Sequence, residues 1–133
     1  MIAATPSPPI QSGPLCVFVP ILVYSENRYR RQSWRVTAAI TRRQRGHIAL
    51  ALYNHKSRLL QLAEGRVQVT LTQVASRRLD EDNLQGALKA IRDEIAAQLK
   101  MDDADSQLRW IYKQETTSDR RNFGVKIEIA AIN

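Results

Sequence analysis

The chain has 133 residues, of which 44% are apolar and 25% are charged, with 20 Lys and Arg against 13 Asp and Glu. This length suffices for one domain with its own core, and the single cysteine, Cys16, excludes an intrachain disulfide. The longest apolar run, 15–24, is too short to span a bilayer, and the Met1 end lacks the basic segment that starts a secretory signal. These features exclude a membrane protein, a disulfide scaffold and a disordered chain, and we expect a soluble, cytoplasmic protein.

The charge is distributed unevenly along the chain. Residues 1–79 hold 12 basic and 2 acidic side chains, whereas residues 80–133 hold 8 basic and 11 acidic side chains. The basic half predicts a polyanionic partner, of which nucleic acid is the commonest. Carboxylates repel phosphate, so the acidic cluster is consistent with such a partner if a divalent cation lies between the two.

The N-terminal part is predicted to be a tail followed by a strand. Residues 1–14 contain four of the five prolines and no charged residue, which predicts a flexible tail ahead of a single domain over 15–133. Residues 15–24 are apolar and β-branched and predict a buried strand, in which Cys16 is expected to be inert core. Pro20 within this run favours an edge strand or a bulge.

A helix and a second strand are predicted next. Residues 25–33 form a polar, arginine-rich loop, after which Ser33 is expected to cap a helix. Apolar residues recur at helical spacing over 34–63, with Gly46 as a point where the helix can kink or split. Residues 66–74 alternate between apolar and polar and predict a half-buried strand.

The second predicted helix, from about 83 to 99, has two distinct faces. Its apolar residues fall on one stripe: Leu84, Leu88, Ile91, Ile95 and Leu99. Its polar residues cluster within about 60° on the other side of the helical wheel: Asp82, Gly86, Lys89 and Asp93. One face is therefore expected to pack in the core, and the other presents polar groups to solvent.

The C-terminal part is predicted to be two consecutive strands, 108–115 and 123–129. Consecutive strands favour a hairpin at the end of the chain. The order is β-α-β-α-β-β, so we expect an α+β fold in which two helices pack on a mixed sheet of about four strands.

Five aspartates flank the second predicted helix: Asp80, Asp82, Asp102, Asp103 and Asp105. In one interpretation they are structural, because Asp80 or Asp82 can cap the helix and Asp102 and Asp103 can be turn residues. In the other, two or three of them hold Mg²⁺, which prefers oxygen ligands and promotes phosphodiester hydrolysis. The residue pattern alone leaves both interpretations open.

Lys89 has the same two interpretations. It lies on the helical face of Asp82, and Gly86 between them leaves space for a substrate, so Lys89 can stabilise developing charge or orient water. Alternatively, Lys89 and Asp93 form an ordinary surface pair at a spacing of four residues.

One long segment resembles the core motif of a known family. The string LDEDNLQGALKAIRDEIAAQLKMDDADSQLRW, 79–110, resembles that of the RusA family of Holliday junction resolvases. That family shows D-x-D-N, then K-A-x-x-D-x-[L/I] on a helix, then a D-D pair before a strand. The matching residues here are 80–83, 89–95 and 102–103. The SENRYRR segment, 25–31, also resembles the family's loop after its first strand, so the likeness covers most of 15–130.

The resemblance implies a RusA-like fold and a nuclease function. Members of the family are Mg²⁺-dependent, homodimeric endonucleases, often from phages, that nick four-way DNA junctions symmetrically. By resemblance the catalytic residues are Asp80, Asp82, Asp103 and Lys89, and the ligands of Mg²⁺ (or Mn²⁺) are Asp80, Asp82, Asp102 and Asp103. The family lysine follows D-x-D-N more closely, where Gly86 stands here. The implied setting is DNA recombination and repair in the cytoplasm of a bacterial or phage-infected cell.

Arginines supply the expected DNA-binding surface. Seven arginines occur within 28–45, a density that is typical either of a solvated basic face or of phosphate contacts. Arg77 and Arg78 either hold the scissile strand or balance the neighbouring acids, and Trp34 either packs or stacks on an unpaired base. The residues expected to contact DNA are Asn27, Arg28, Arg30, Arg31, Arg35, Arg42, Arg43, Arg77 and Arg78.

Other functions receive less support from the sequence. The chain has no His and Cys cluster of the kind that binds zinc and no glycine-rich nucleotide motif, so we expect neither zinc nor a nucleotide cofactor. The main alternative is a catalytically inactive RusA-like protein that binds DNA through its arginines. A helix-turn-helix regulator is a more distant alternative, because a strand is predicted between the two helices.

Overall fold

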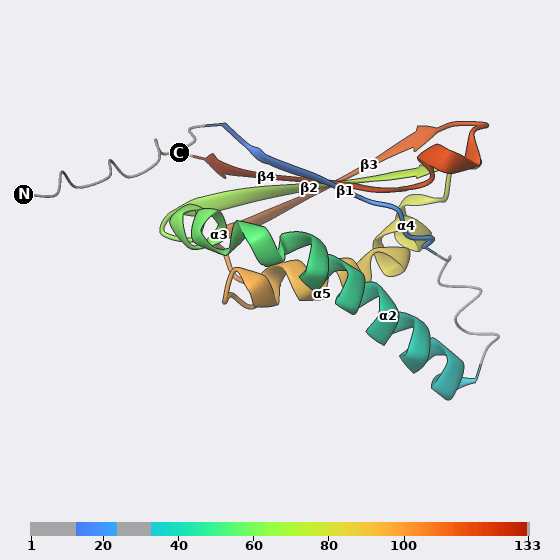
Figure 1. The fold of residues 1–133 in the computed structure, drawn as a ribbon, viewed down its shortest axis with the longest axis horizontal. Helices are drawn as coiled ribbons and strands as arrows, with labels where there is room; N and C mark the ends of the chain where they lie inside the picture. The colour runs from blue at the N-terminus through green and yellow to red at the C-terminus, as the bar shows by residue number, and fades with distance from the viewer. Residues whose placement is uncertain (1–12, 24–32, 133) are drawn as a thin grey trace, which may run out of the picture.

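The computed structural model describes residues 13–23 and 33–132. The elements follow in the order β1 (Leu15–Val19), α2 (Trp34–Leu52), the 3₁₀ turn η1 (Tyr53–His55), α3 (Lys56–Leu62), β2 (Arg66–Ala75), α4 (Glu81–Ala87), α5 (Lys89–Gln98), β3 (Leu108–Thr116), the 3₁₀ turn η2 (Arg120–Asn122) and β4 (Gly124–Ile132). The four strands form one mixed sheet, and the helices lie on one face of it (Figure 1). The predicted α+β class and four-stranded mixed sheet are therefore confirmed. No helix in the described ranges is long and apolar enough to cross a membrane.

The strand order in the sheet is β1-β4-β2-β3. β4 pairs antiparallel with both β1 and β2, and β2 pairs parallel with β3. The predicted hairpin between the last two strands is therefore wrong, because β2 lies between them. Residues 117–123 carry the chain past the end of β2, where the amide of Thr117 donates to the carbonyl of Ala75 at 2.9 Å. The predicted edge position of the first strand is confirmed, and β1 ends directly before Pro20.

The expected helices are each divided in the structure. The segment 34–63 forms α2 and α3 with the break at η1, so Gly46 lies within a continuous helix. Ser33 caps α2 as predicted, because its Oγ accepts from the amide of Val36 at 3.4 Å. The segment 83–99 is divided at Leu88, which is wholly buried and leaves the helical region with φ −94° and ψ 1°.

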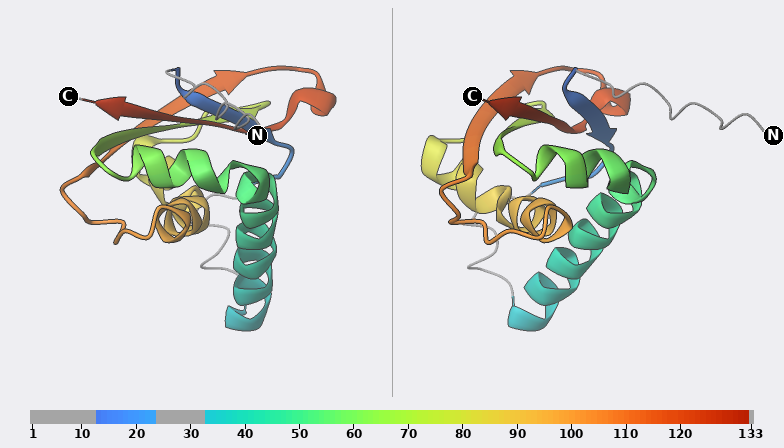
Figure 2. Two further views of the ribbon diagram at one scale, coloured as in Figure 1. Left: turned by 60° about the vertical axis from the view of Figure 1, so that its left-hand side comes forward. Right: turned by 90° about the vertical axis from the view of Figure 1, so that its left-hand side faces the viewer.

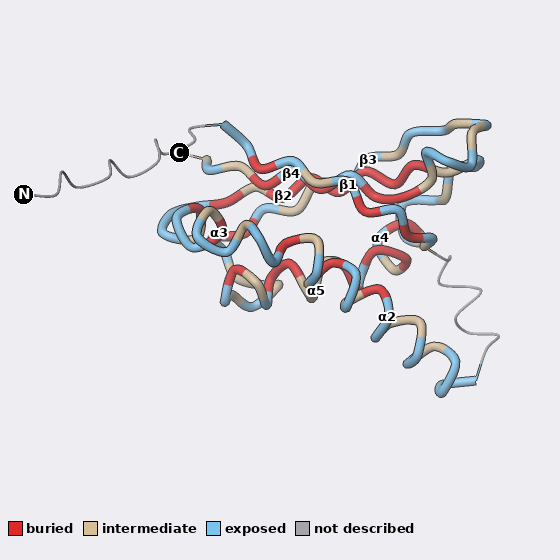
Figure 3. Tube along the Cα trace, in the orientation of Figure 1, coloured by how far each residue is buried: buried red, intermediate tan, exposed pale blue. Residues whose placement is uncertain are grey.

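The core lies between the helices and one face of the sheet (Figure 3). Its largest fully buried side chains come from both layers: Ile48, Leu52, Leu59, Leu71, Leu88, Ile91, Ile95, Leu99, Ile127 and Ile129. β2 was expected to be half-buried, but as a central strand it is buried on both faces, including Thr70 and Thr72. The buried apolar stripe predicted for 83–99 is confirmed in full.

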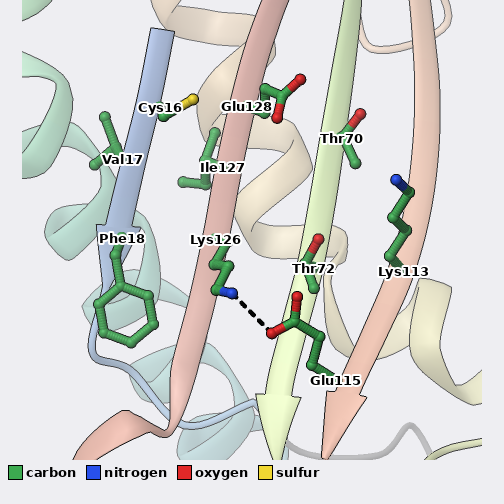
Figure 4. Close-up of a pocket in the computed structure, with 10 residues that line it drawn as sticks. All are labelled: Cys16, Val17, Phe18, Thr70, Thr72, Lys113, Glu115, Lys126, Ile127 and Glu128. Carbon is green, nitrogen blue, oxygen red and sulfur yellow. Dashed lines mark hydrogen bonds and ion pairs between the residues drawn. The ribbon is translucent and has the colours of Figure 1, made fainter.

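The other face of the sheet carries no helix (Figure 2). A hollow of about 490 Å³ lies on it, and its lining includes Cys16, Phe18 and Thr72 (Figure 4). Nζ of Lys126 on β4 lies 2.7 Å from a carboxylate oxygen of Glu115 on β3, across the buried Thr72. Because Cys16 lies on this helix-free face it is exposed, so the prediction that it is core is wrong.

Two glycines provide a matched test of this packing. A Cβ at Gly124 would lie 2.7 Å from Cζ of Phe18 and closer still to the carbonyl oxygen of Val19, whereas a Cβ at Gly46 would meet nothing within 4 Å. Gly124→Ala should therefore lower the free energy of unfolding by about 1–3 kcal/mol through overpacking. Gly46→Ala should raise it by up to about 1 kcal/mol, because alanine favours the helix. Urea denaturation measures both, and equal effects would contradict the pairing of β1 with β4.

Candidate functional site

The chain leaves β2 through a loop that is held against β3. Oε1 of Gln114 on β3 accepts from the amide of Leu79 at 2.7 Å, and Nε2 of Gln114 donates to the carbonyl of Leu79 at 2.8 Å. One side chain thus satisfies both polar groups of a main-chain residue, as a neighbouring strand would. This pair fixes the start of α4, and with it the first acidic motif, beside β3.

Asp80 and Asp82 lie at this start of α4, and both are exposed. Asp80 occupies the N-cap position with an extended backbone, and its carbonyl accepts from the amide of Leu84 at 2.8 Å. Its carboxylate makes no capping hydrogen bond. The structural interpretation is therefore confirmed in part: Asp80 occupies the N-cap and Asp82 the first turn, where the positive helix terminus favours acids, but Asp80 makes no side-chain cap.

A hollow of about 240 Å³ adjoins this acidic motif between α4 and β3. Arg78 contributes a cation to its lining, together with Glu81, Gln85 and the aromatic side chain of Tyr112, while Lys113 borders it with its side chain on the helix-free face of the sheet (Figure 4). Neighbouring carboxylates and cations are the groups that phosphodiester chemistry requires, since the cations bind phosphate oxygens. Lys113 was not predicted from the sequence, which gave no reason to place β3 beside the acidic motif.

The second acidic cluster lies in the turn between α5 and β3. Oδ1 of Asp102 accepts from the amide of Ala104 at 2.9 Å, and Oδ1 of Asp105 accepts from the amide of Gln107 at 2.9 Å. Both are side-chain turns onto the residue two positions ahead. The turn interpretation is thus confirmed for Asp102, and Asp105 has the same role.

Asp103 differs from its neighbours because it is held by an arginine of α5. Nε of Arg92 lies 3.3 Å from Oδ2 of Asp103, and Nη2 of Arg92 donates to the carbonyl oxygen of Asp103 at 3.3 Å. Nε1 of Trp110 donates to the same carbonyl oxygen at 2.9 Å. The guanidinium carbon of Arg92 lies over the Trp110 ring, 5.1 Å from the ring centroid. Nη1 of Arg92 donates to the hydroxyl of Tyr112 at 2.8 Å. The turn that bears Asp103 is therefore fixed against β3.

The connection from β2 to β3 carries both acidic groups. Nine register pairs, from Val67↔Leu108 to Ala75↔Thr116, run in the same direction, so the chain leaves β2 at one end of the sheet and enters β3 at the other. Asp80 and Asp82 lie near the start of this connection, and Asp103 lies in the turn near its end. The described residues contain no group of three or more His, Cys, Asp or Glu that could hold a metal ion. The expectation that Asp80, Asp82 and Asp103 meet within one chain is therefore wrong. The expected ligands of Mg²⁺ do not form a metal-binding group in a single chain.

Lys89 is exposed and begins α5. The break at Leu88 means that the continuous helical wheel, which placed Lys89 on the face of Asp82, does not apply. Among the described residues the ion pairs do not include Lys89 with Asp93, so their interpretation as a surface pair is not supported. The role of Lys89 as a catalytic residue is therefore supported by the motif alone and not by the geometry of the structure.

The predicted basic residues of the described ranges are accessible. Arg35, Arg42, Arg43, Arg77 and Arg78 are all exposed, the first three on α2 and the last two in the loop before α4. Nε of Arg45, at the middle of α2, lies 3.1 Å from Oε1 of Glu94 on α5, and this pair joins the two helices. Asn27, Arg28, Arg30 and Arg31 lie outside the described residues.

No family model matches this chain, and no curated protein matches it. Its function is therefore argued from the motif and the geometry. The residues that sequence reasoning missed are those of β3: Trp110, Tyr112, Lys113 and Gln114. The alternation of 108–115 was a signal that Trp110, Tyr112 and Gln114 share a face, and the structure directs that face toward α4 and α5.

The Arg92 network generates a stability prediction. Arg92→Lys should lower the free energy of unfolding by about 1–2 kcal/mol, because a single ammonium cannot contact Tyr112 and Asp103 and also cover Trp110. Arg78→Lys, at an exposed position, is the matched control and should change it by less than about 0.5 kcal/mol. Urea denaturation followed by circular dichroism measures both, and an Arg92→Lys protein as stable as wild type would contradict the network.

Proposed function

We propose that this protein is a Mg²⁺-dependent endonuclease that nicks branched DNA, with four-way junctions as its main substrate. The observation that carries the proposal is the state of Asp80 and Asp82, which are exposed at the start of α4 while Asp80 forms no side-chain cap. Carboxylates at a helix N-terminus stabilise it by only about 0.3–1 kcal/mol. Their position beside a hollow lined by Arg78 favours a role toward a phosphate-containing substrate.

The separation of the acidic groups makes the dimer part of this proposal. Mg²⁺ retains several waters and needs few carboxylates, so Asp80 and Asp82 provide an incomplete protein ligand set that a third carboxylate can complete. Within one chain, Asp80, Asp82 and Asp103 form no group that could hold a metal ion. In a two-fold dimer, Asp103 of one copy can approach Asp80 and Asp82 of the other, and the symmetry produces two equivalent sites. Two such sites match the two equivalent strands of a four-way junction.

The basic residues have a defined place in this function. Arg77 and Arg78 precede Asp80 on the same loop, and Gln114 fixes the end of that loop, so the phosphate-binding cations and the acids are held together. The overall charge of +7 adds attraction that does not depend on DNA sequence. A role in DNA recombination or repair in the cytoplasm of a bacterial or phage-infected cell follows from this substrate.

A catalytically inactive DNA-binding protein of the same fold is the alternative. It is favoured by one observation, which is that the described residues of one chain assemble no group able to hold a metal ion. The two functions share the basic surface and differ only in the need for the acids. Removing a carboxylate without changing the shape of its side chain therefore separates them.

Asp82→Asn should lower the rate of nicking a labelled four-way junction in Mg²⁺ by at least about 100-fold, since a metal-bound carboxylate contributes several kcal/mol to catalysis. Its binding to the junction in Ca²⁺ should stay within about twofold of wild type or tighten. Glu64→Gln is the matched control, because Glu64 is an exposed acid outside both the motif and the hollow, and it should keep its activity. If wild-type protein binds junctions but nicks none in Mg²⁺ or Mn²⁺, the inactive alternative is correct.

A further inference from the structure

The N-terminal half of α2 projects beyond the rest of the protein (Figure 2). No residue from 34 to 43 is buried, and the first buried residue of the helix is Gln44. The packed part of α2 begins there, with Ile48 and Leu52 in the core and Arg45 paired to Glu94 of α5. Ten residues of α-helix, about 15 Å in length, therefore place no side chain in the core, and only the end of this segment, at Ile40 and Arg43, lies beside the residues that follow β1. We call residues 34–43 the α2 arm.

The α2 arm presents apolar surface that nothing in the described chain covers. Trp34 is 75% exposed at its first position, and Val36 is 46% exposed. Of the two interpretations of Trp34, packing is therefore not supported in this structure. An exposed tryptophan at the projecting end of a helix indicates a surface that contacts another molecule.

The charge of the arm determines which kind of molecule fits it. Arg35, Arg42 and Arg43 are exposed, and no acidic residue occurs from Trp34 to Ala63. Arg35 and Arg42, seven residues apart, lie along one line of the helix. Two copies of such an arm would repel each other, so a second copy of this chain does not fit. A polyanion does fit, and nucleic acid is the polyanion on which the proposed function depends.

Trp34 adds a feature that a purely phosphate-binding helix does not need. The guanidinium carbon of Arg35 lies over the Trp34 ring, 5.5 Å from the centroid, so a cation covers one face of the ring and the opposite face is the one that can stack on a base. Tryptophan and arginine together stack on unpaired or unstacked bases, while in continuous duplex the bases already stack on each other. We infer that the α2 arm binds DNA at a branch point, with Trp34 stacked on a base that the branch leaves unstacked. This inference rests on the proposed DNA substrate but not on nuclease activity.

Binding in Ca²⁺, which allows no cleavage in the proposed reaction, tests the inference directly. Trp34→Leu should weaken binding to a four-way junction by about tenfold, the size expected for one stacked base, and weaken binding to a duplex of equal length by less than twofold. Trp34→Phe, which keeps an aromatic face, should bind within about threefold of wild type. A 2-aminopurine base at the branch point should be quenched by wild-type protein and not by Trp34→Leu. Because Trp34 is exposed, none of these variants disturbs the core.

The outcomes separate this inference from the proposed function. The inference is wrong if Trp34→Leu binds the junction as tightly as wild type, if it loses affinity equally for the junction and the duplex, or if it quenches the probe equally well. None of these results contradicts the nuclease proposal. If the effects are as expected but wild type never nicks in Mg²⁺, the inference stands and the nuclease proposal fails. Vesicles containing phosphatidylserine are the remaining control. If Trp34→Leu loses binding to these vesicles but keeps its binding to DNA, the inference is overturned.

Discussion

The parallel pairing of β2 with β3 is the constraint on which the rest of the structure depends. Parallel neighbours need a crossover connection, and here α4 and α5 form it across the face of the sheet. Both acidic groups lie on this crossover, one near its start and one near its end. The side chains of Gln114 and Arg92 fix these two parts of the crossover to β3. The described residues of one chain form no group of acids that could hold a metal ion, so the function we propose uses two copies of the chain.

Much of the fold follows from local patterns in the sequence. Alternation and helical spacing located the four strands and the helical segments, and Ser33 marked the start of α2. The pairing of the strands did not follow, because adjacency along the chain favours a hairpin, whereas the apolar β2 is buried by having a neighbour on each side. The exposure of Cys16 was not predicted either, because Cys16 lies on the face of the sheet that the helices leave uncovered. A strand pattern gives the two faces of a strand, but it does not say which face the helices cover.

The candidate site was only partly predictable. The motif identified Asp80, Asp82 and Asp103, but a motif carries no distance, and the described residues form no group of acids that could hold a metal ion. The break at Leu88 likewise changed the position of Lys89 relative to Asp82. Tertiary partners decided the remaining roles: an arginine eleven residues upstream fixes Asp103, and the backbone of their own turn engages Asp102 and Asp105. Such contacts are set by packing and have no local signal.

The central claim is that two copies of the chain complete each active site, and mixed dimers test it most directly. Asp82→Asn and Asp103→Asn proteins, each inactive alone, are mixed, allowed to exchange subunits and assayed on a labelled four-way junction in Mg²⁺. If each site combines Asp82 of one copy with Asp103 of the other, the mixed dimer retains one intact site, and single-strand nicking reappears. If the mixture stays as inactive as the separate variants, while wild type is active and the subunits have exchanged, the shared-site account is contradicted.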